Sequence, residues 1–202
     1  MIRVKICGIT RPGDALAAAR AGVDAIGLVF VERSKRHVSV DQANEICKVL
    51  PPFVGRVGLF MDCPAPTVRQ VLETVPLDWL QFHGQEDEDW CRQFQRPWIK
   101  AIAMGNRDGH DRDFGFASAA ALLLDSHAGG ELGGSGQQFD WQAATPVDRP
   151  WILAGGLDPD NVARACRQLR PDAVDVSSGV ESHPGIKDDK LMIDFIKAVK
   201  NG

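Results

Sequence analysis

The chain has little of what marks secreted, membrane or nucleic-acid-binding proteins. Its 202 residues include 23 basic and 27 acidic ones, so the net charge of −4 leaves no basic surplus for a nucleic-acid surface. No run approaches the roughly 18 apolar residues of a membrane span, and the N-terminus turns polar too early for a signal peptide. We expect neither nucleic acid nor a membrane as a partner.

Cysteines are also few, odd in number and scattered: Cys7, Cys47, Cys63, Cys91 and Cys166. No two have Cys-x-x-Cys spacing, and no nearby histidine completes a zinc pattern, so we expect neither disulfides nor a structural metal. Reduced thiols favour a cytoplasmic location.

No low-complexity linker divides the chain, whose length is near that of one domain. A hydrophobic content of 44% and a charged content of 25% are ordinary for a globular protein. We therefore expect residues 1–202 to form a single domain.

Short apolar runs, each followed by a turn and then a helical pattern, recur along the chain. The predicted strands are Arg3–Ile6, Ala25–Phe30, Val54–Phe60, Trp79–Phe82, Trp98–Ile102, Ala120–Leu124, Trp151–Ala154 and Ala173–Val176. The predicted helices are Pro12–Ala21, Asp41–Val49, Ala65–Val75, Asp87–Gln95, Pro159–Leu169 and Asp188–Val199, with weaker patterns at Arg107–Ala117 and Gln137–Thr145.

Strands that are apolar on both faces and alternate with helices favour parallel pairing. Eight such units fit an α/β fold, the (β/α)8 TIM barrel, in a compact form because these barrels usually take about 250 residues. The alternative is a doubly wound open sheet. That fold normally has a Gly-x-Gly-x-x-Gly turn after its first strand, where this chain reads Cys-Gly-Ile-Thr-Arg-Pro-Gly.

In such a barrel, catalytic groups lie at the carboxyl ends of the strands. Cys7 follows the first predicted strand, where a thiol of lowered pKa can act as a base; a small buried hydrophobe is the alternative. Asp125 follows the apolar sixth strand, where desolvation would raise the pKa of its carboxyl and suit a proton donor; a turn or cap residue is the alternative. An acid and a base facing each other across a barrel fit an isomerisation.

Three glycine-rich segments follow predicted strands: Gly133-Gly134-Ser135-Gly136, Ala154-Gly155-Gly156-Leu157 and Ser177-Ser178-Gly179-Val180. The last two follow the seventh and eighth strands, where barrels commonly hold phosphate on backbone N–H groups. The phosphate candidates are therefore Gly155, Gly156, Ser178 and Gly179, with plain turns as the alternative. Gly134 belongs to a loop that could be a lid over a substrate or a bare flexible loop.

Two further polar residues follow predicted strands. Arg36 could hold a carboxylate bidentately, but a solvated basic loop is favoured for the run in which it lies. His83 could orient a substrate or carry a proton, and a polar layer at the barrel rim is an equal alternative.

Seven ordered motifs resemble the phosphoribosylanthranilate isomerase family, small (β/α)8 barrels of tryptophan biosynthesis. They are Lys5-Ile6-Cys7-Gly8-Ile9-Thr10, Gly27-Leu28-Val29-Phe30 with Ser34-Lys35-Arg36-His37-Val38-Ser39, Leu80-Gln81-Phe82-His83-Gly84, Leu124-Asp125-Ser126, Gly133-Gly134-Ser135-Gly136, Leu153-Ala154-Gly155-Gly156-Leu157 with Asn161-Val162, and Val174-Asp175-Val176-Ser177-Ser178-Gly179-Val180-Glu181 followed by Pro184-Gly185-Ile186-Lys187-Asp188. Phe82 and Lys35 are departures, since the family often has Leu and Pro there.

The resemblance implies an Amadori rearrangement of N-(5-phosphoribosyl)anthranilate to 1-(2-carboxyphenylamino)-1-deoxyribulose 5-phosphate, the third step from chorismate. It implies no metal or organic cofactor, Cys7 as general base and Asp125 as general acid. Arg36 would bind the anthranilate carboxylate, which replaces the solvated-loop interpretation. The partner is then a small phosphorylated substrate, and the protein is a monomer or a homodimer.

Two other functions compete with this one. The histidine-pathway isomerase performs the same rearrangement but uses an aspartate where this chain has Cys7. A non-catalytic phosphate-binding barrel is the other alternative, and the intact pair of Cys7 and Asp125 speaks against it.

Overall fold

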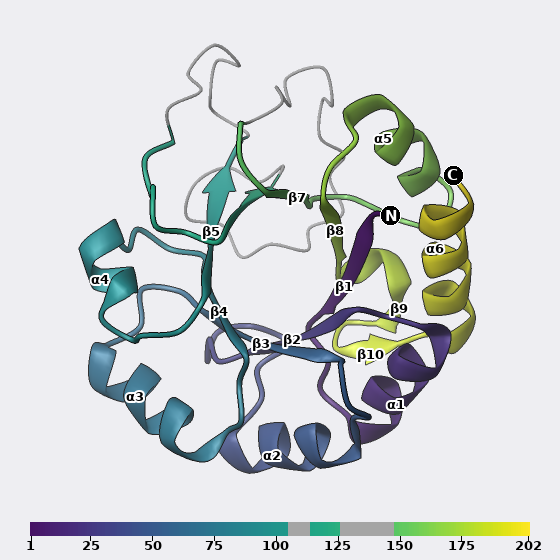
Figure 1. Cartoon of the computed structure of the whole chain (residues 1–202). Helices are drawn as coiled ribbons and strands as arrows, with labels where there is room; N and C mark the ends of the chain where they lie inside the picture. Colours follow the sequence, from purple (N-terminus) through teal and green to yellow (C-terminus); the bar gives the residue numbers. More distant parts are fainter. Residues whose placement is uncertain (105–113, 126–147) are drawn as a thin grey trace.

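A closed barrel of eight parallel strands forms the centre of the protein (Figure 1). The computed structural model describes residues 1–104, 114–125 and 148–202. The strands are β1 (Arg3–Cys7), β2 (Ala25–Val29), β3 (Gly55–Phe60), β4 (Trp79–Phe82), β5 (Trp98–Ala103), β6 (Ala121–Asp125), β7 (Trp151–Leu153) and β8 (Ala173–Val176). They are hydrogen-bonded in chain order, and β1 closes on β8. The predicted (β/α)8 barrel is confirmed, and the open sheet is excluded.

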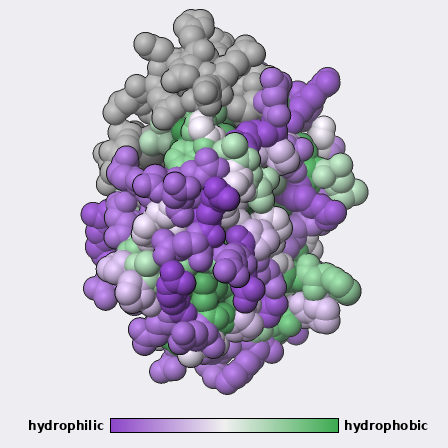
Figure 2. Space-filling model, turned by 60° about the vertical axis from the view of Figure 1, so that its left-hand side comes forward, coloured by the Kyte–Doolittle hydropathy of each residue, from purple (hydrophilic) through white to green (hydrophobic). Residues whose placement is uncertain are grey.

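Helices cover the outside of the barrel (Figure 1). They are α1 (Pro12–Ala21), α2 (Val40–Val49), α3 (Ala65–Thr74), α4 (Glu88–Arg92), α5 (Val162–Leu169) and α6 (Asp189–Asn201). No helix of the described ranges is long and apolar enough to cross a membrane. Figure 2 shows one face of the molecule, on which hydrophilic residues predominate around smaller apolar patches.

Aspartate side chains that accept backbone hydrogen bonds accompany the later starts of α4 and α5. Asp87 is the cap of α4 and accepts a hydrogen bond from the Trp90 backbone N–H at 2.8 Å, so the helix begins one residue later than expected. Before α5, Asp158 Oδ1 accepts from the backbone N–H groups of Asp160 and Asn161, both at 2.9 Å. This turn delays the helix until Val162.

The two weakly patterned helices gain no support. Residues 114–117, the described end of the helix predicted at Arg107–Ala117, lie in irregular structure and a turn, so that prediction is wrong there. The rest of that segment and the whole of Gln137–Thr145 lie outside the described residues.

A short hairpin between β8 and α6 was not predicted. A 3₁₀ turn (Ser178–Val180) follows β8, and β9 (Glu181–His183) then pairs antiparallel with β10 (Ile186–Lys187). The hairpin is tied to the beginning of α1, because the Lys187 backbone N–H donates to Asp14 Oδ2 at 3.1 Å. Its strands are too short to carry a hydrophobic pattern, which is why the sequence does not reveal it.

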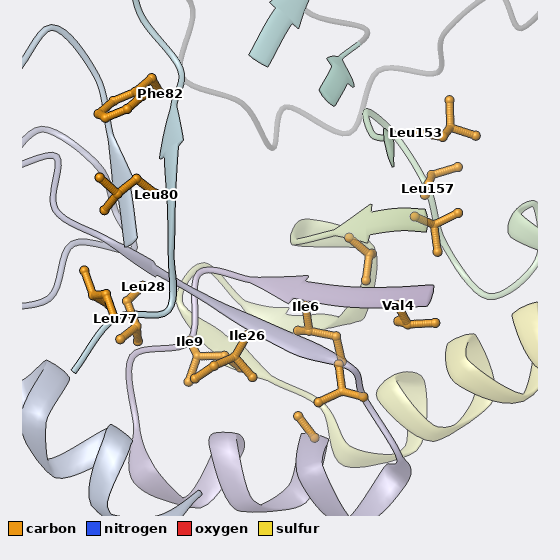
Figure 3. Packing of buried hydrophobic residues seen from close by; sticks show 14 of the residues in the cluster. Val4, Ile6, Ile9, Ile26, Leu28, Leu77, Leu80, Phe82, Leu153 and Leu157 are labelled. Carbon is orange, nitrogen blue, oxygen red and sulfur yellow. The ribbon is translucent and has the colours of Figure 1, made fainter. Parts of the chain in front are cut away.

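Alternate residues of the strands pack outward against the helices. Figure 3 shows part of this layer, including Val4, Ile6, Ile26, Leu28, Leu80, Phe82 and Leu153. A second apolar cluster, of inward-facing residues, includes Val57, Ile99, Leu123 and Ile152. The outer layer holds the helices on the barrel, and the inner positions near the strand ends are left for polar groups.

Phe82 is the centre of an aromatic cluster in the outer layer. Its ring centroid lies 5.2 Å from that of Trp90, 5.7 Å from Phe94 and 6.2 Å from Trp98. We expect Phe82→Ala to lower the free energy of unfolding by about 3–5 kcal/mol, measured by urea denaturation, because it leaves a cavity among these rings. The matched control is Phe53→Ala, since Phe53 is fully exposed and its truncation should change stability little. Equal losses in both variants would contradict this account of the core.

Candidate active site

The carboxyl ends of the strands surround a cavity at one end of the barrel. Seven of the predicted site residues line it: Cys7, Arg36, His83, Asp125, Gly155, Gly156 and Ser178. Gly179 packs against the backbone of Leu157, and Gly134 lies outside the described residues. The barrel therefore brings together residues that lie far apart in the sequence.

Cys7 is the last residue of β1 and lines the cavity. Gly27 on the neighbouring strand gives the thiol room, because a Cβ at Gly27 would lie 2.7 Å from the Cys7 sulfur. The pKa of this thiol lies above its ordinary value, not below it as expected for a base, because burial raises it and the positive charges of Lys5 and Lys187 offset that only in part. Cys7 also contacts apolar side chains, but the two ammonium groups beside it favour a chemical role over that of a buried hydrophobe.

Lys5 lies on the inner face of the barrel, one inward position below Cys7. Its Nζ donates to Asp175 Oδ1 at 2.9 Å, and both side chains are almost completely buried. Burial alone would lower the pKa of Lys5, but the attraction of Asp175 and Cys7 raises it above its ordinary value. A protonated amine is thus held next to the thiol.

Asp125 is the last residue of β6, and its side chain is only 8% exposed. His83 Nε2 lies 3.5 Å from Asp125 Oδ2, and Gln81 Nε2 lies 3.1 Å from His83 Nδ1. A Gln81 amide that donates to Nδ1 leaves the imidazole proton on Nε2, facing the carboxylate. The polar layer considered for the barrel rim is present here, and it adjoins Asp125.

A buried ion pair fixes the loop that carries His83. Lys100 Nζ donates to Glu86 Oε2 at 2.9 Å and to the Gly84 carbonyl at 2.5 Å. Glu86 Oε2 also accepts from the Gly84 backbone N–H at 2.9 Å. The loop after β4 is therefore attached to β5, which limits where the imidazole can lie.

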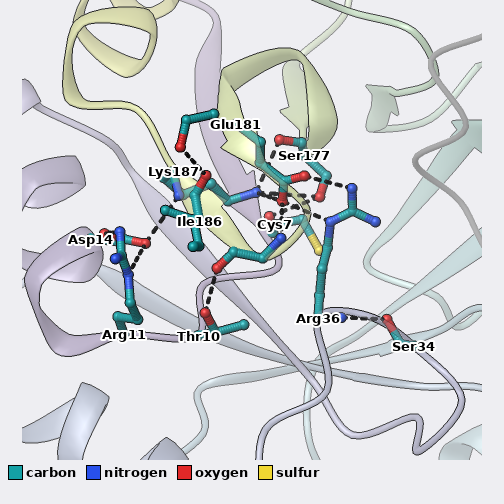
Figure 4. A network of polar contacts seen from close by, with 12 residues as sticks. Cys7, Thr10, Arg11, Asp14, Ser34, Arg36, Ser177, Glu181, Ile186 and Lys187 are labelled. Atoms are coloured by element: carbon teal, nitrogen blue, oxygen red, sulfur yellow. Dashed lines mark hydrogen bonds and ion pairs between the residues drawn. The ribbon is translucent and has the colours of Figure 1, made fainter.

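Arg36 is not a solvated loop residue, as the basic run around it had suggested. Its Nε donates to Glu181 Oε1 at 2.8 Å and its Nη2 to Glu181 Oε2 at 2.7 Å (Figure 4). The Arg36 side chain is 13% exposed and the Glu181 side chain 5%. The hydrogen bonds to Glu181 raise the pKa of Arg36, which keeps the guanidinium charged.

The loops after β7 and β8 pack directly on each other. Gly155 and Gly156 have φ values of 87° and 62°, which side chains other than glycine rarely adopt. The Asn161 side chain holds this turn by donating to the Gly156 carbonyl at 2.8 Å. A Cβ at Gly179 would overlap the carbonyl oxygen of Leu157, so only glycine allows the two loops to approach so closely.

Sequence reasoning missed the buried polar residues that support the site: Lys5, Gln81, Asp175, Glu181 and Lys187. A usable signal existed for the first three, because each is a polar residue inside an otherwise apolar predicted strand. Such a residue is costly to bury unless it is paired, so it indicates a partner inside the barrel. Glu181 and Lys187 carried no such signal, since they lie in the hairpin that was not predicted.

In the parts of the chain that the structure describes, no group of three or more His, Cys, Asp or Glu side chains could hold a metal ion.

Residues 4–198 match the family model of N-(5'-phosphoribosyl)anthranilate (PRA) isomerase. The chain is 49% identical to the N-(5'-phosphoribosyl)anthranilate isomerase of Pseudomonas aeruginosa, over 99% of this chain and 96% of that protein.

Solved structures agree with the sequence match. A phosphoribosyl anthranilate isomerase in complex with reduced 1-(o-carboxyphenylamino)-1-deoxyribulose 5-phosphate is 39% identical, with a TM-score of 0.84 over 100% of both chains. Monomers of the dimeric isomerase from Thermotoga maritima are 37% identical, with a TM-score of 0.87 over 100% of both chains. The chain therefore belongs to the N-(5'-phosphoribosyl)anthranilate isomerase family, isomerases of tryptophan biosynthesis, as its sequence motifs had indicated.

Proposed function

We propose that the cavity carries out the Amadori rearrangement of N-(5'-phosphoribosyl)anthranilate with Asp125 as general acid and Cys7 as general base. The observation that carries this assignment is that Cys7 and Asp125, from the first and sixth strands of a closed barrel, line the same cavity. A small substrate between them can meet an acid on one side and a base on the other.

The first step opens the sugar ring. The Asp125 carboxyl gives its proton to the furanose ring oxygen, the C1′–O bond breaks, and the nitrogen lone pair forms a C1′=N iminium. The Cys7 thiolate then removes the proton from C2′, and the electrons of that C–H bond form an enolamine. A proton added at C1′ and the loss of the C2′ hydroxyl proton give the ketone, so no atom is gained or lost overall.

Two anchors would hold the substrate between the acid and the base. Arg36 binds the anthranilate carboxylate. The backbone N–H groups of Gly155, Gly156, Ser178 and Gly179 bind the phosphate. Gly134, which lies outside the described residues, is assigned to substrate binding. Fixing both ends in this way supplies the orientation that proton transfer needs.

In this mechanism His83 orients the Asp125 carboxyl. Its Nε2 lies 3.5 Å from Asp125 Oδ2, and it lines the cavity beside that carboxyl. We assign it to substrate binding and to orienting Asp125, with Gln81 holding the imidazole from behind.

The activity can be tested by following the fluorescence of phosphoribosylanthranilate, supplied by anthranilate phosphoribosyltransferase, after the protein is added. Loss of fluorescence with formation of the ketone product supports the proposal. No loss would indicate a non-catalytic barrel, and turnover of the histidine-pathway substrate would indicate a broader isomerase.

We also propose a cytoplasmic location for the enzyme. All five cysteines are free, which supports the cytoplasm. We regard residues 1–202 as one catalytic domain that acts as a monomer or a homodimer. The dimeric relative from Thermotoga maritima supports the homodimer, and sedimentation analysis of the purified chain decides between the two.

Replacing either proton-transfer residue should nearly abolish turnover. We expect Cys7→Ser and Asp125→Asn each to lower kcat by about 10²–10⁴-fold, because general acid–base catalysis contributes about that much. Binding of the reduced product analogue should stay within a few-fold of the wild type. Cys47→Ser is the matched control, since Cys47 lies in α2 away from the cavity. Wild-type turnover in either active-site variant would remove that residue from its role.

The pH dependence of Cys7 alkylation follows from its burial. Burial raises the pKa of the thiol above the ordinary value of 9.0, so the thiolate fraction of the free enzyme is small at neutral pH. We expect the rate of alkylation by iodoacetamide to rise about tenfold per pH unit from pH 6 to 9, because only the thiolate reacts. The measurement is mass spectrometry of the peptide that contains Cys7. A plateau below pH 8 would show instead that the thiolate is already formed at neutral pH.

Gly179→Ala should weaken phosphate binding. The new Cβ would push the loops after β7 and β8 apart, because it overlaps the Leu157 carbonyl. We expect the inhibition constant of inorganic phosphate to rise at least about tenfold, the loss of one or two charge-assisted hydrogen bonds. Gly13→Ala is the control, since a Cβ at Gly13 meets no atom within 4 Å. An unchanged inhibition constant in Gly179→Ala would place the phosphate elsewhere.

A further inference from the structure

Glu181 holds Arg36 by one edge of its guanidinium. The two hydrogen bonds run from Nε and Nη2, which form the side edge of the planar group. In Figure 4 the dashed lines from Glu181 reach Arg36 from one side only. The other edge, formed by Nη1 and Nη2, can still donate two hydrogen bonds to a second carboxylate, because a guanidinium has five N–H donors in a fixed plane.

The two hydrogen bonds to Glu181 fix the Arg36 side chain in one position. An arginine has many rotamers, and ordering it when a ligand binds costs free energy that reduces affinity. Arg36 lines the cavity and is already held before any ligand arrives. The Arg36 side chain can take this position because residue 8 is glycine: a Cβ at Gly8 would overlap Cδ of Arg36.

We propose that Glu181 is a positioning residue for carboxylate recognition: it holds the side edge of Arg36 so that the end edge faces the cavity and selects a substrate whose aromatic amine carries a carboxylate. This inference rests on the proposed role of Arg36. It adds a residue that touches no substrate and that determines selectivity through Arg36.

The negative charge of Glu181 does not cancel the attraction of Arg36 for an anionic ligand, because Glu181 is also paired with Lys187. Lys187 Nζ donates to Glu181 Oε1 at 2.8 Å and to the Ser177 carbonyl at 3.0 Å, and its side chain is completely buried. Two cations therefore share one anion, and the group keeps a net positive charge while Lys187 is protonated. Burial lowers the pKa of Lys187, and the contact with Glu181 opposes that effect.

The hairpin β9–β10 is the element that brings these groups together. Glu181 and Lys187 are register partners on its two strands. Gly185, in the turn, donates its backbone N–H to Glu181 Oε1 at 3.3 Å, and its carbonyl accepts from Thr10 Oγ1. Because the hairpin is also tied to α1, the Glu181 carboxylate has a fixed position relative to the end of β1.

The test measures inhibition constants of two ligands: reduced 1-(o-carboxyphenylamino)-1-deoxyribulose 5-phosphate and its phenylamino counterpart, which lacks the carboxylate. The quantity of interest is the ratio of the two constants, the carboxylate preference. We expect Glu181→Gln to lower this preference at least about tenfold, equivalent to about 1.4 kcal/mol. Binding of the counterpart should stay within about twofold, because it does not use Arg36.

Three further variants make the outcomes separable. Arg36→Met should remove the preference altogether. Asp78→Asn, which breaks the bidentate pair with Arg56 away from the cavity, should leave it unchanged. Glu181→Gln combined with Lys187→Met removes the buried pair together, leaves no unpaired ammonium at position 187, and should lower the preference like the single variant. This double variant supplies the measurement if the single one fails to fold.

The results distinguish a failure of the carboxylate anchor at Arg36 from a failure of the positioning role of Glu181. If Arg36→Met keeps the preference, the proposed carboxylate anchor is wrong, and the role of Glu181 is wrong with it. If Arg36→Met removes the preference but both Glu181 variants keep it, Arg36 is the anchor and only the positioning role of Glu181 is wrong. A loss of thermal stability in Glu181→Gln without a change in preference would likewise reduce Glu181 to a purely structural residue.

Discussion

One buried ion pair lies between β1 and β8, where the barrel closes. Lys5 and Asp175 are 170 residues apart in the sequence but are register partners on the two strands. Lys5 Nζ lies 2.9 Å from Asp175 Oδ1. An unpaired charge inside the barrel would cost several kcal/mol, so a slip of either strand is strongly disfavoured. Such a slip by one residue would also turn Cys7 toward the helices.

The same pairing principle recurs around the cavity. Arg36 and Lys187 share Glu181, and Lys100 pairs with Glu86 under the loop that carries His83. In the proposed mechanism, Glu181 positions Arg36, and the pair of Lys100 and Glu86 positions the loop that carries His83. The apolar layers supply the stability of the barrel, whereas these ion pairs determine where its few reactive groups lie. The rim of the barrel can then hold the proposed acid, base and two anchors.

How far the sequence predicts the site depends on where each residue lies in its element. Cys7 and Asp125 were found because each ends an apolar strand, a position that parallel barrels give to functional groups. Lys5 and Asp175 lie inside strands, where a polar residue in an apolar run indicates a buried partner but does not say which residue that partner is. Glu181 could not be found at all, since strands of two or three residues leave no periodic signal.

Local sequence patterns were enough to predict the barrel, the order of its units and the chemical types at the strand ends. These follow from local periodicity and from glycine and capping residues, which act over a few neighbouring positions. The folded chain is needed to see which charges pair, which face of each strand lies inside, and that Arg36 is held by Glu181 and not solvated. Those outcomes depend on distances between residues far apart in the chain, and such distances are fixed only when the barrel closes and excludes water.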